Sequence, residues 1–90
     1  MPYQIKLHRE VARALSRMPP GLRSTIIDKL RALEEDPYTT RPGADIIRLR
    51  GTKGREDLFR LRIGDYRAIY AVHEDCVYVT DLFHRGRGYI

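Results

Sequence analysis

The sequence has 90 residues, 42% of them hydrophobic and 32% charged, which predicts a single folded domain over residues 1–90 and excludes a disordered chain. Its one cysteine, Cys76, excludes an internal disulfide and a zinc–cysteine cluster, and no apolar run approaches the roughly 18 residues of a membrane span. Seventeen basic residues, fourteen of them arginines, against twelve acidic ones give a net charge of +5, which favours nucleic acid or an acidic protein as partner. Because no signal-peptide pattern is present, we expect a cytoplasmic protein with no membrane partner.

The first part of the chain predicts a short strand and then two helices. Residues 3–8 alternate weakly, as in a strand. Over residues 9–18, apolar side chains recur at i, i+4 and i+7, and three arginines form a stripe on another face. The break at 19–21 leads into a second helix, which the Asp36-Pro37 pair ends because the residue before proline avoids helical dihedral angles. A break this short predicts an antiparallel helical hairpin.

From residue 47 onward the apolar residues recur with a period of two, which predicts strands. Ile47 and Leu49 alternate with arginines, and so do the apolar residues of a strand over 58–63. A tight turn separates that strand from two more, over 66–72 and 76–83. In the last strand the polar Asp81 shares its parity with two valines, and we expect a β-bulge to correct this.

This order of elements predicts the α+β class. An N-terminal strand and a helical hairpin should pack on one face of a mostly antiparallel sheet of four to five strands. The odd-numbered apolar residues of strand 58–63 then lie beneath the helices, and Arg60 and Arg62 point to the opposite, open face. Arginine keeps its proton at any ordinary pH, so these side chains must meet water, a carboxylate or an external anion.

Three segments resemble the RelE/ParE superfamily of toxin–antitoxin toxins: LRG at 49–51, FRLRIGDYRAIY at 59–70 and HRGRGY at 84–89. The resemblance covers essentially the whole chain and implies a RelE-like fold. It implies the toxin of a type II toxin–antitoxin system, an endoribonuclease (mRNA interferase) of the RelE branch that cleaves mRNA in the ribosomal A site and inhibits translation. The implied partners are a RelB-like antitoxin with an acidic segment that wraps the toxin, the ribosome, mRNA and ribosomal RNA.

The resemblance also implies which residues act on the RNA. Residues that fall on catalytic positions are Arg60, Arg67, Arg85 and Tyr89, and the expected substrate contacts are Arg50, Arg62 and His84. Cleavage through the 2′-hydroxyl needs a base, cations for the charged phosphorane, and an acid for the leaving oxygen. The forked guanidiniums of Arg67 and Arg85 suit the second task.

Other interpretations of these residues remain open. His84 is the natural proton carrier by its pKa class, but a hydrogen-bonded histidine that ends a strand explains it equally well. Tyr89 is either a base-stacking residue or a frayed terminal one. Leu58 stands where some RelE toxins have a catalytic lysine, which leaves the general base unassigned. Tyr66 and Tyr70 are expected in the core.

Two other functions are compatible with the resemblance. One is a ParE-like toxin that binds and inhibits DNA gyrase without nuclease activity. The other is an inactive partner that only binds an antitoxin and helps it to repress DNA. The intact arginine set favours the nuclease. No histidine pair has metal-ligand spacing, so we expect a metal-independent reaction with no cofactor.

Overall fold

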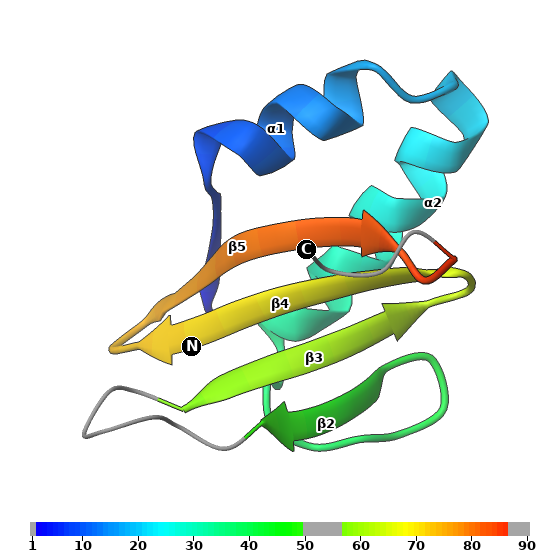
Figure 1. The fold of residues 1–90 in the computed structure, drawn as a ribbon. Helices are drawn as coiled ribbons and strands as arrows, with labels where there is room; N and C mark the ends of the chain where they lie inside the picture. Colours follow the sequence, from blue (N-terminus) through cyan, green and yellow to red (C-terminus); the bar gives the residue numbers. More distant parts are fainter. Residues whose placement is uncertain (1, 50–56, 87–90) are drawn as a thin grey trace.

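The computed structural model describes residues 2–49 and 57–86, and these build one five-stranded sheet with helices on one side. The elements are β1 (Gln4–Leu7), α1 (Arg9–Ser16), α2 (Pro20–Arg31), the 3₁₀ turn η1 (Ala32–Glu34), β2 (Asp45–Leu49), β3 (Leu58–Ile63), β4 (Tyr66–His73) and β5 (Cys76–His84). The strand order is β1-β5-β4-β3-β2, with β1 and β5 parallel and the other three pairs antiparallel. The predicted α+β fold is therefore confirmed (Figure 1).

A side-chain cap opens α1, and side-chain hydrogen bonds tie the two helices together. The Nδ1 atom of His8 accepts from the Glu10 N–H (3.1 Å) at the start of α1, and Pro20 opens α2, as predicted. Arg23 on α2 donates to the Leu15 and Met18 carbonyls, at 3.1 and 3.0 Å. These bonds tie the start of α2 to the chain at the end of α1. Neither helix is long and apolar enough to span a membrane, as far as the described residues extend.

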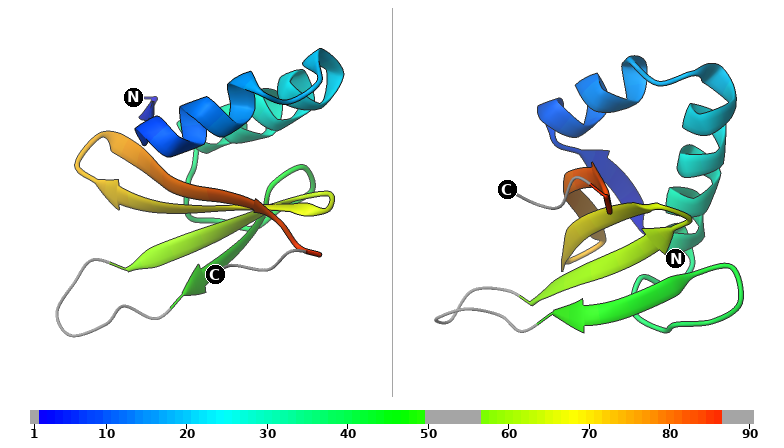
Figure 2. Two further views of the ribbon diagram at one scale, coloured as in Figure 1. Left: turned by 45° about the horizontal axis from the view of Figure 1, so that its top comes forward. Right: turned by 45° about the vertical axis from the view of Figure 1, so that its right-hand side comes forward.

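The core lies between the helices and one face of the sheet, as the left view of Figure 2 shows. The odd-numbered apolar residues of β3 are buried beneath the helices, as predicted: Phe59, Leu61 and Ile63. Tyr70 is fully buried and its hydroxyl donates to the Pro37 carbonyl at 2.7 Å, while Tyr66 is half-buried against the same core. Among residues 2–49 and 57–86, one sheet face is thus covered by the helices and the other is open.

The predicted β-bulge is present in β5. In the β4–β5 ladder, Ile69 lies opposite Asp81 and Tyr70 lies opposite Val79, so Thr80 is the extra residue. The shift lets Leu82 pack against the core, although Val77 and Val79 have the other parity. Asp81 falls in the row of Ile69, on the open face.

Strand β2 corrects one expectation. The alternation of Ile47 and Leu49 with arginines suggested that these two residues form the apolar face. Instead Ile46 is buried opposite Leu61, whereas Ile47 is 46% exposed opposite Arg60. The segment carries apolar residues of both parities, so its pattern alone could not set the register.

Candidate functional site

Arginines from neighbouring strands meet on the open face of the sheet. Cross-strand partners lie on the same face of a sheet, and Arg62 is directly opposite Arg67 in the β3–β4 ladder. Arg60 is two residues from Arg62 along β3, so it shares this face, opposite Ile47 on one side and Ile69 on the other. Because the intervening residues of β3 are buried beneath the helices, the predicted open-face placement of Arg60 and Arg62 is confirmed.

Arg85 joins them from the end of β5. Its backbone N–H donates to the Asp65 carbonyl at 2.7 Å, and its Nε atom is 3.5 Å from Asp65 Oδ1. Asp65 belongs to the turn between β3 and β4, two residues before Arg67, and its charge acts on that of Arg67. We call Arg60, Arg62, Arg67 and Arg85 the arginine cluster.

The β3–β4 turn holds Arg67 in place. Its Nη1 atom donates to the Gly64 carbonyl at 2.9 Å and to the Tyr66 carbonyl at 3.0 Å. Gly64 has φ +59°, a backbone conformation that glycine adopts without steric cost. Loss of hydration, followed by the positive charges of Arg62, Arg60 and Arg85, lowers the pKa of the Arg67 guanidinium. Arg67 is therefore close enough to the other three charges to be repelled by them, and an anion would relieve that repulsion.

Arg60 is the most enclosed residue of the salt bridges at this site. Its side chain is 22% exposed, and its Nη2 atom is 3.2 Å from Asp45 Oδ1. Its Nε atom is buried and has no hydrogen-bond partner among the described residues. A buried donor left unpaired costs free energy, so Arg60 is not fully satisfied in the free protein.

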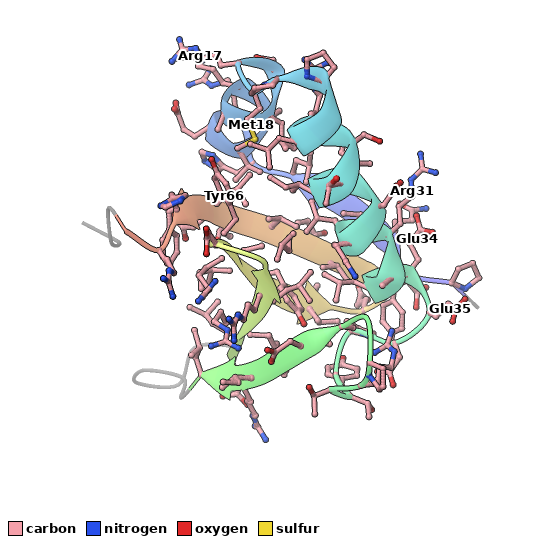
Figure 3. The ribbon with its side chains drawn as sticks, turned by 90° about the vertical axis from the view of Figure 1, so that its right-hand side faces the viewer. Arg17, Met18, Arg31, Glu34, Glu35 and Tyr66 are labelled. Carbon is pink, nitrogen blue, oxygen red and sulfur yellow. The ribbon has the colours of Figure 1, made fainter. Side chains whose placement is uncertain are left out.

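His84 ends β5, one residue before Arg85. His84 lies opposite Tyr66 in the β4–β5 ladder, and the two rings meet edge to face with centroids 5.2 Å apart. Tyr66 packs against the core on the helix side, near Met18 (Figure 3). The bulge at Thr80 gives His84 the parity of the helix-facing residues, so its ring lies on the helix side of the sheet.

Two predicted site residues, Arg50 and Tyr89, lie outside the described residues. Leu58, which replaces the lysine of some RelE toxins, is on the open face and 36% exposed. Within residues 2–49 and 57–86, no three His, Cys, Asp or Glu side chains gather closely enough to hold a metal ion.

Sequence reasoning missed the carboxylates of the site. Asp45 pairs with Arg60, and Asp65 pairs with Arg85. Asp65 sits in the recognised Gly-Asp turn and could have been found there. Asp45 could not, because its position beside Arg60 depends on how β2 is registered against β3.

Sequence and structure comparisons agree on the kind of protein. The model of a family described as "ParE toxin of type II toxin-antitoxin system, parDE" matches residues 5–89. A chain of the archaeal RelE-RelB complex from Pyrococcus horikoshii OT3 is 36% identical, with a TM-score of 0.80, over 98% of this chain and 100% of that chain. No curated protein sequence matches.

Two more distant structures share the fold. A chain of the toxin-antitoxin complex RelBE2 from Mycobacterium tuberculosis is 22% identical, with a TM-score of 0.73, over 94% of this chain and 100% of that chain. A mutant of E. coli toxin RelE in the free state is 18% identical, with a TM-score of 0.62, over 98% of this chain and 88% of that chain.

Proposed function

Because this chain belongs to the RelE/ParE superfamily and is a toxin of the type II toxin–antitoxin class, we propose that it is a ribosome-dependent endoribonuclease. The proposed reaction is cleavage of mRNA in the ribosomal A site, which inhibits translation in the cytoplasm. The observation that carries the proposal is the arginine cluster, in which two guanidiniums come from β3, one from β4 and one from the turn after β5, at one end of the open face. Such a cluster suits a reaction in which negative charge builds up on phosphate.

Each member of the arginine cluster has a proposed role. Arg67 and Arg85 stabilise the phosphorane, since a guanidinium fork matches two non-bridging oxygens. Arg60 adds a further charge to the transition state, and the exposed Arg62 contacts the substrate. Arg50 as a substrate contact and Tyr89 as a catalytic residue remain part of the proposal. His84, which directly precedes Arg85, also remains a proposed substrate contact, although its ring packs edge to face on Tyr66.

The proposed regulator is a cognate, RelB-like antitoxin. The similar archaeal RelE was crystallised as a complex with RelB, and this chain offers a sheet face with fixed positive charge. An antitoxin with an acidic segment would cover that face and block access of RNA to the arginine cluster.

Expression of the toxin alone tests the nuclease proposal. We expect growth to stop, with cleavage inside the translated regions of messages, because the reaction requires mRNA held in the ribosome. Primer extension on one message measures this, and a copy of that message without a start codon is the control. Cleavage of both copies would contradict ribosome dependence.

A ParE-like gyrase inhibitor is the second candidate, since the matching family description names ParE. The same cells distinguish the two. Intact messages together with gyrase-trapped DNA breaks would assign the chain to the ParE branch and leave the arginine cluster without a catalytic role.

A further inference from the structure

We propose that Asp45 is a specificity-determining residue that keeps Arg60 occupied in the free toxin, so that an RNA phosphate must displace its carboxylate. This inference rests on the proposed function, because it explains how the toxin would discriminate between free RNA and message held in the ribosome. Asp45 would therefore act through Arg60, as a positioning residue, and not on the RNA itself.

The geometry places Asp45 within the row of open-face arginines. It is the first residue of β2 and lies directly opposite Arg62, while its Oδ1 atom is 3.2 Å from Arg60 Nη2. The Asp45 side chain is 51% exposed, against 22% for Arg60. Asp45 can therefore turn into solvent at little cost, whereas Arg60 stays in place on the sheet.

Arg60 is prepared to exchange this carboxylate for a phosphate. Its Nε donor is buried and has no acceptor in the described part of the chain, so it would gain from a rearrangement that supplies another oxygen. Ile47 and Ile69 lie on either side of it in the neighbouring strands. These apolar neighbours limit water around the stem, which strengthens whichever ion pair the guanidinium makes.

The Asp45 carboxylate competes with any incoming phosphate for Arg60, and it therefore lowers the affinity of Arg60 for each of them. Free RNA has to overcome that competition with its own affinity. Message already held by the ribosome presents its phosphate at a high effective concentration and overcomes it more easily. Asp45 would thus weaken the binding of free RNA while leaving the ribosome-held substrate accessible. The second carboxylate, Asp65, lies beside the more exposed Arg85 and is expected to compete less.

Binding of a fluorescent single-stranded RNA, without ribosomes, tests this role. We expect Asp45→Asn to bind about fivefold more tightly than the wild type, the upper range for release of one exposed ion pair. We also expect log K to fall more steeply with log salt, by about 0.7, because Arg60 gains a phosphate contact. Asp45→Glu keeps the competing charge and should behave like the wild type.

Two controls separate this mechanism from a change in net charge. Asp75→Asn removes an exposed carboxylate in the β4–β5 turn, at the other end of β4 from Asp65, and should leave the salt slope unchanged. When Arg60 is already replaced by Ala, Asp45→Asn should not raise the RNA affinity, since the phosphate contact of Arg60 is missing. Melting temperatures show whether each variant is folded.

Two results would overturn the inference. If Asp45→Asn binds RNA more weakly, Asp45 orients Arg60 for the phosphate and does not compete with it. If Asp45→Asn raises the RNA affinity no more than Asp75→Asn does, and the two variants have the same salt slope, the effect comes only from long-range charge. Cleavage of ribosome-held message by the wild type is measured separately: its absence would refute the nuclease proposal, whereas the RNA-binding data decide the role of Asp45.

Discussion

At the level of single residues, arginine has two kinds of role in this protein, and hydrogen-bond partners distinguish them. Arg41 donates to the carbonyls of Ala32, Asp36 and Thr39, which fastens the chain after η1. Arg23 serves the end of α1 in the same way. Arg62, by contrast, projects from the open face. Net charge alone therefore overstates how many arginines are available to an anion.

Arg67 combines both roles, which leads to a specific prediction. Changing Arg67 to Ala should slow single-turnover cleavage of ribosome-bound mRNA by about 100-fold or more, the scale of losing one oxyanion donor. Ribosome binding should weaken far less, because many basic residues share phosphate contacts. Arg67→Lys should restore little, since an ammonium lacks the two-pronged geometry.

The control for Arg67 is Arg13→Ala, which removes the same charge from an exposed position on α1. It should cleave at close to the wild-type rate. Normal cleavage by Arg67→Ala would show that Arg67 is structural and only holds the β3–β4 turn through its bonds to Gly64 and Tyr66. A large fall in melting temperature would lead to the same conclusion.

At the level of elements, β4 joins the two sides of the sheet. Its Tyr70 packs against Phe59 on β3, with ring centroids 5.5 Å apart, and donates to the Pro37 carbonyl of the chain after η1. Its neighbour Ile69 lies in the open-face row with Arg60. One strand thus anchors the core on one face and supports the arginine cluster on the other.

Tyr70→Phe tests this anchor through stability and its dependence on pH. At neutral pH we expect a loss of about 1 kcal/mol in the free energy of unfolding, because the Pro37 carbonyl loses its donor. Burial raises the pKa of Tyr70 above its ordinary value. The folded state thus favours the neutral phenol over the phenolate. The stability that this preference contributes is fully present below the unfolded pKa of about 10, and it is lost as the pH rises from there through the raised pKa of the folded state.

Urea unfolding at about pH 8 and about pH 11 measures the effect. The wild type should lose more stability between these two values than Tyr70→Phe does. Equal losses in the wild type and Tyr70→Phe would show that the buried hydroxyl does not titrate with unfolding.

At the scale of the whole molecule, the helices cover one face of a five-stranded sheet (Figure 2). Within the described residues the other face, which carries Arg60, Arg62 and Arg67, is left uncovered. The positive charges of Arg60, Arg62 and Arg85 act on that of Arg67, and the carboxylates of Asp45 and Asp65 pair with two of the four arginines. A partner that supplies more negative charge to this face would therefore stabilise the fold as well as block the site.

We expect the antitoxin to raise the thermal stability of the toxin. With free antitoxin at about 100 times its Kd, the gain is about 2.7 kcal/mol, or a rise in Tm of roughly 10–20 °C for a domain of this size. Co-expression, pull-down and calorimetry measure it, with an antitoxin that lacks its acidic residues as control. A toxin that is recovered alone, and that melts at the same temperature with antitoxin present, would contradict the proposed partnership.

Much of this architecture follows from local patterns in the chain. The helices were predicted from the helical spacing of apolar residues from Val11 onward. Strand β3 was predicted from the alternation of Phe59, Leu61 and Ile63, and the bulge from the parity of Asp81. These predictions succeeded because each depends on which face of one element avoids water, a property that nearby residues decide. The open-face position of Arg60 and Arg62 followed from the same alternation.

Only the tertiary structure decided which residues each charged side chain contacts. β2 has apolar residues of both parities, so only its pairing with β3 showed that Ile46 is buried and that Asp45 reaches Arg60. The motif places His84 beside Arg85 in sequence, yet the bulge turns its ring toward Tyr66 on the other face. The physical reason is the same in both cases: strand pairing joins residues far apart in the chain, and a shift of one position moves a side chain to the opposite face of the sheet.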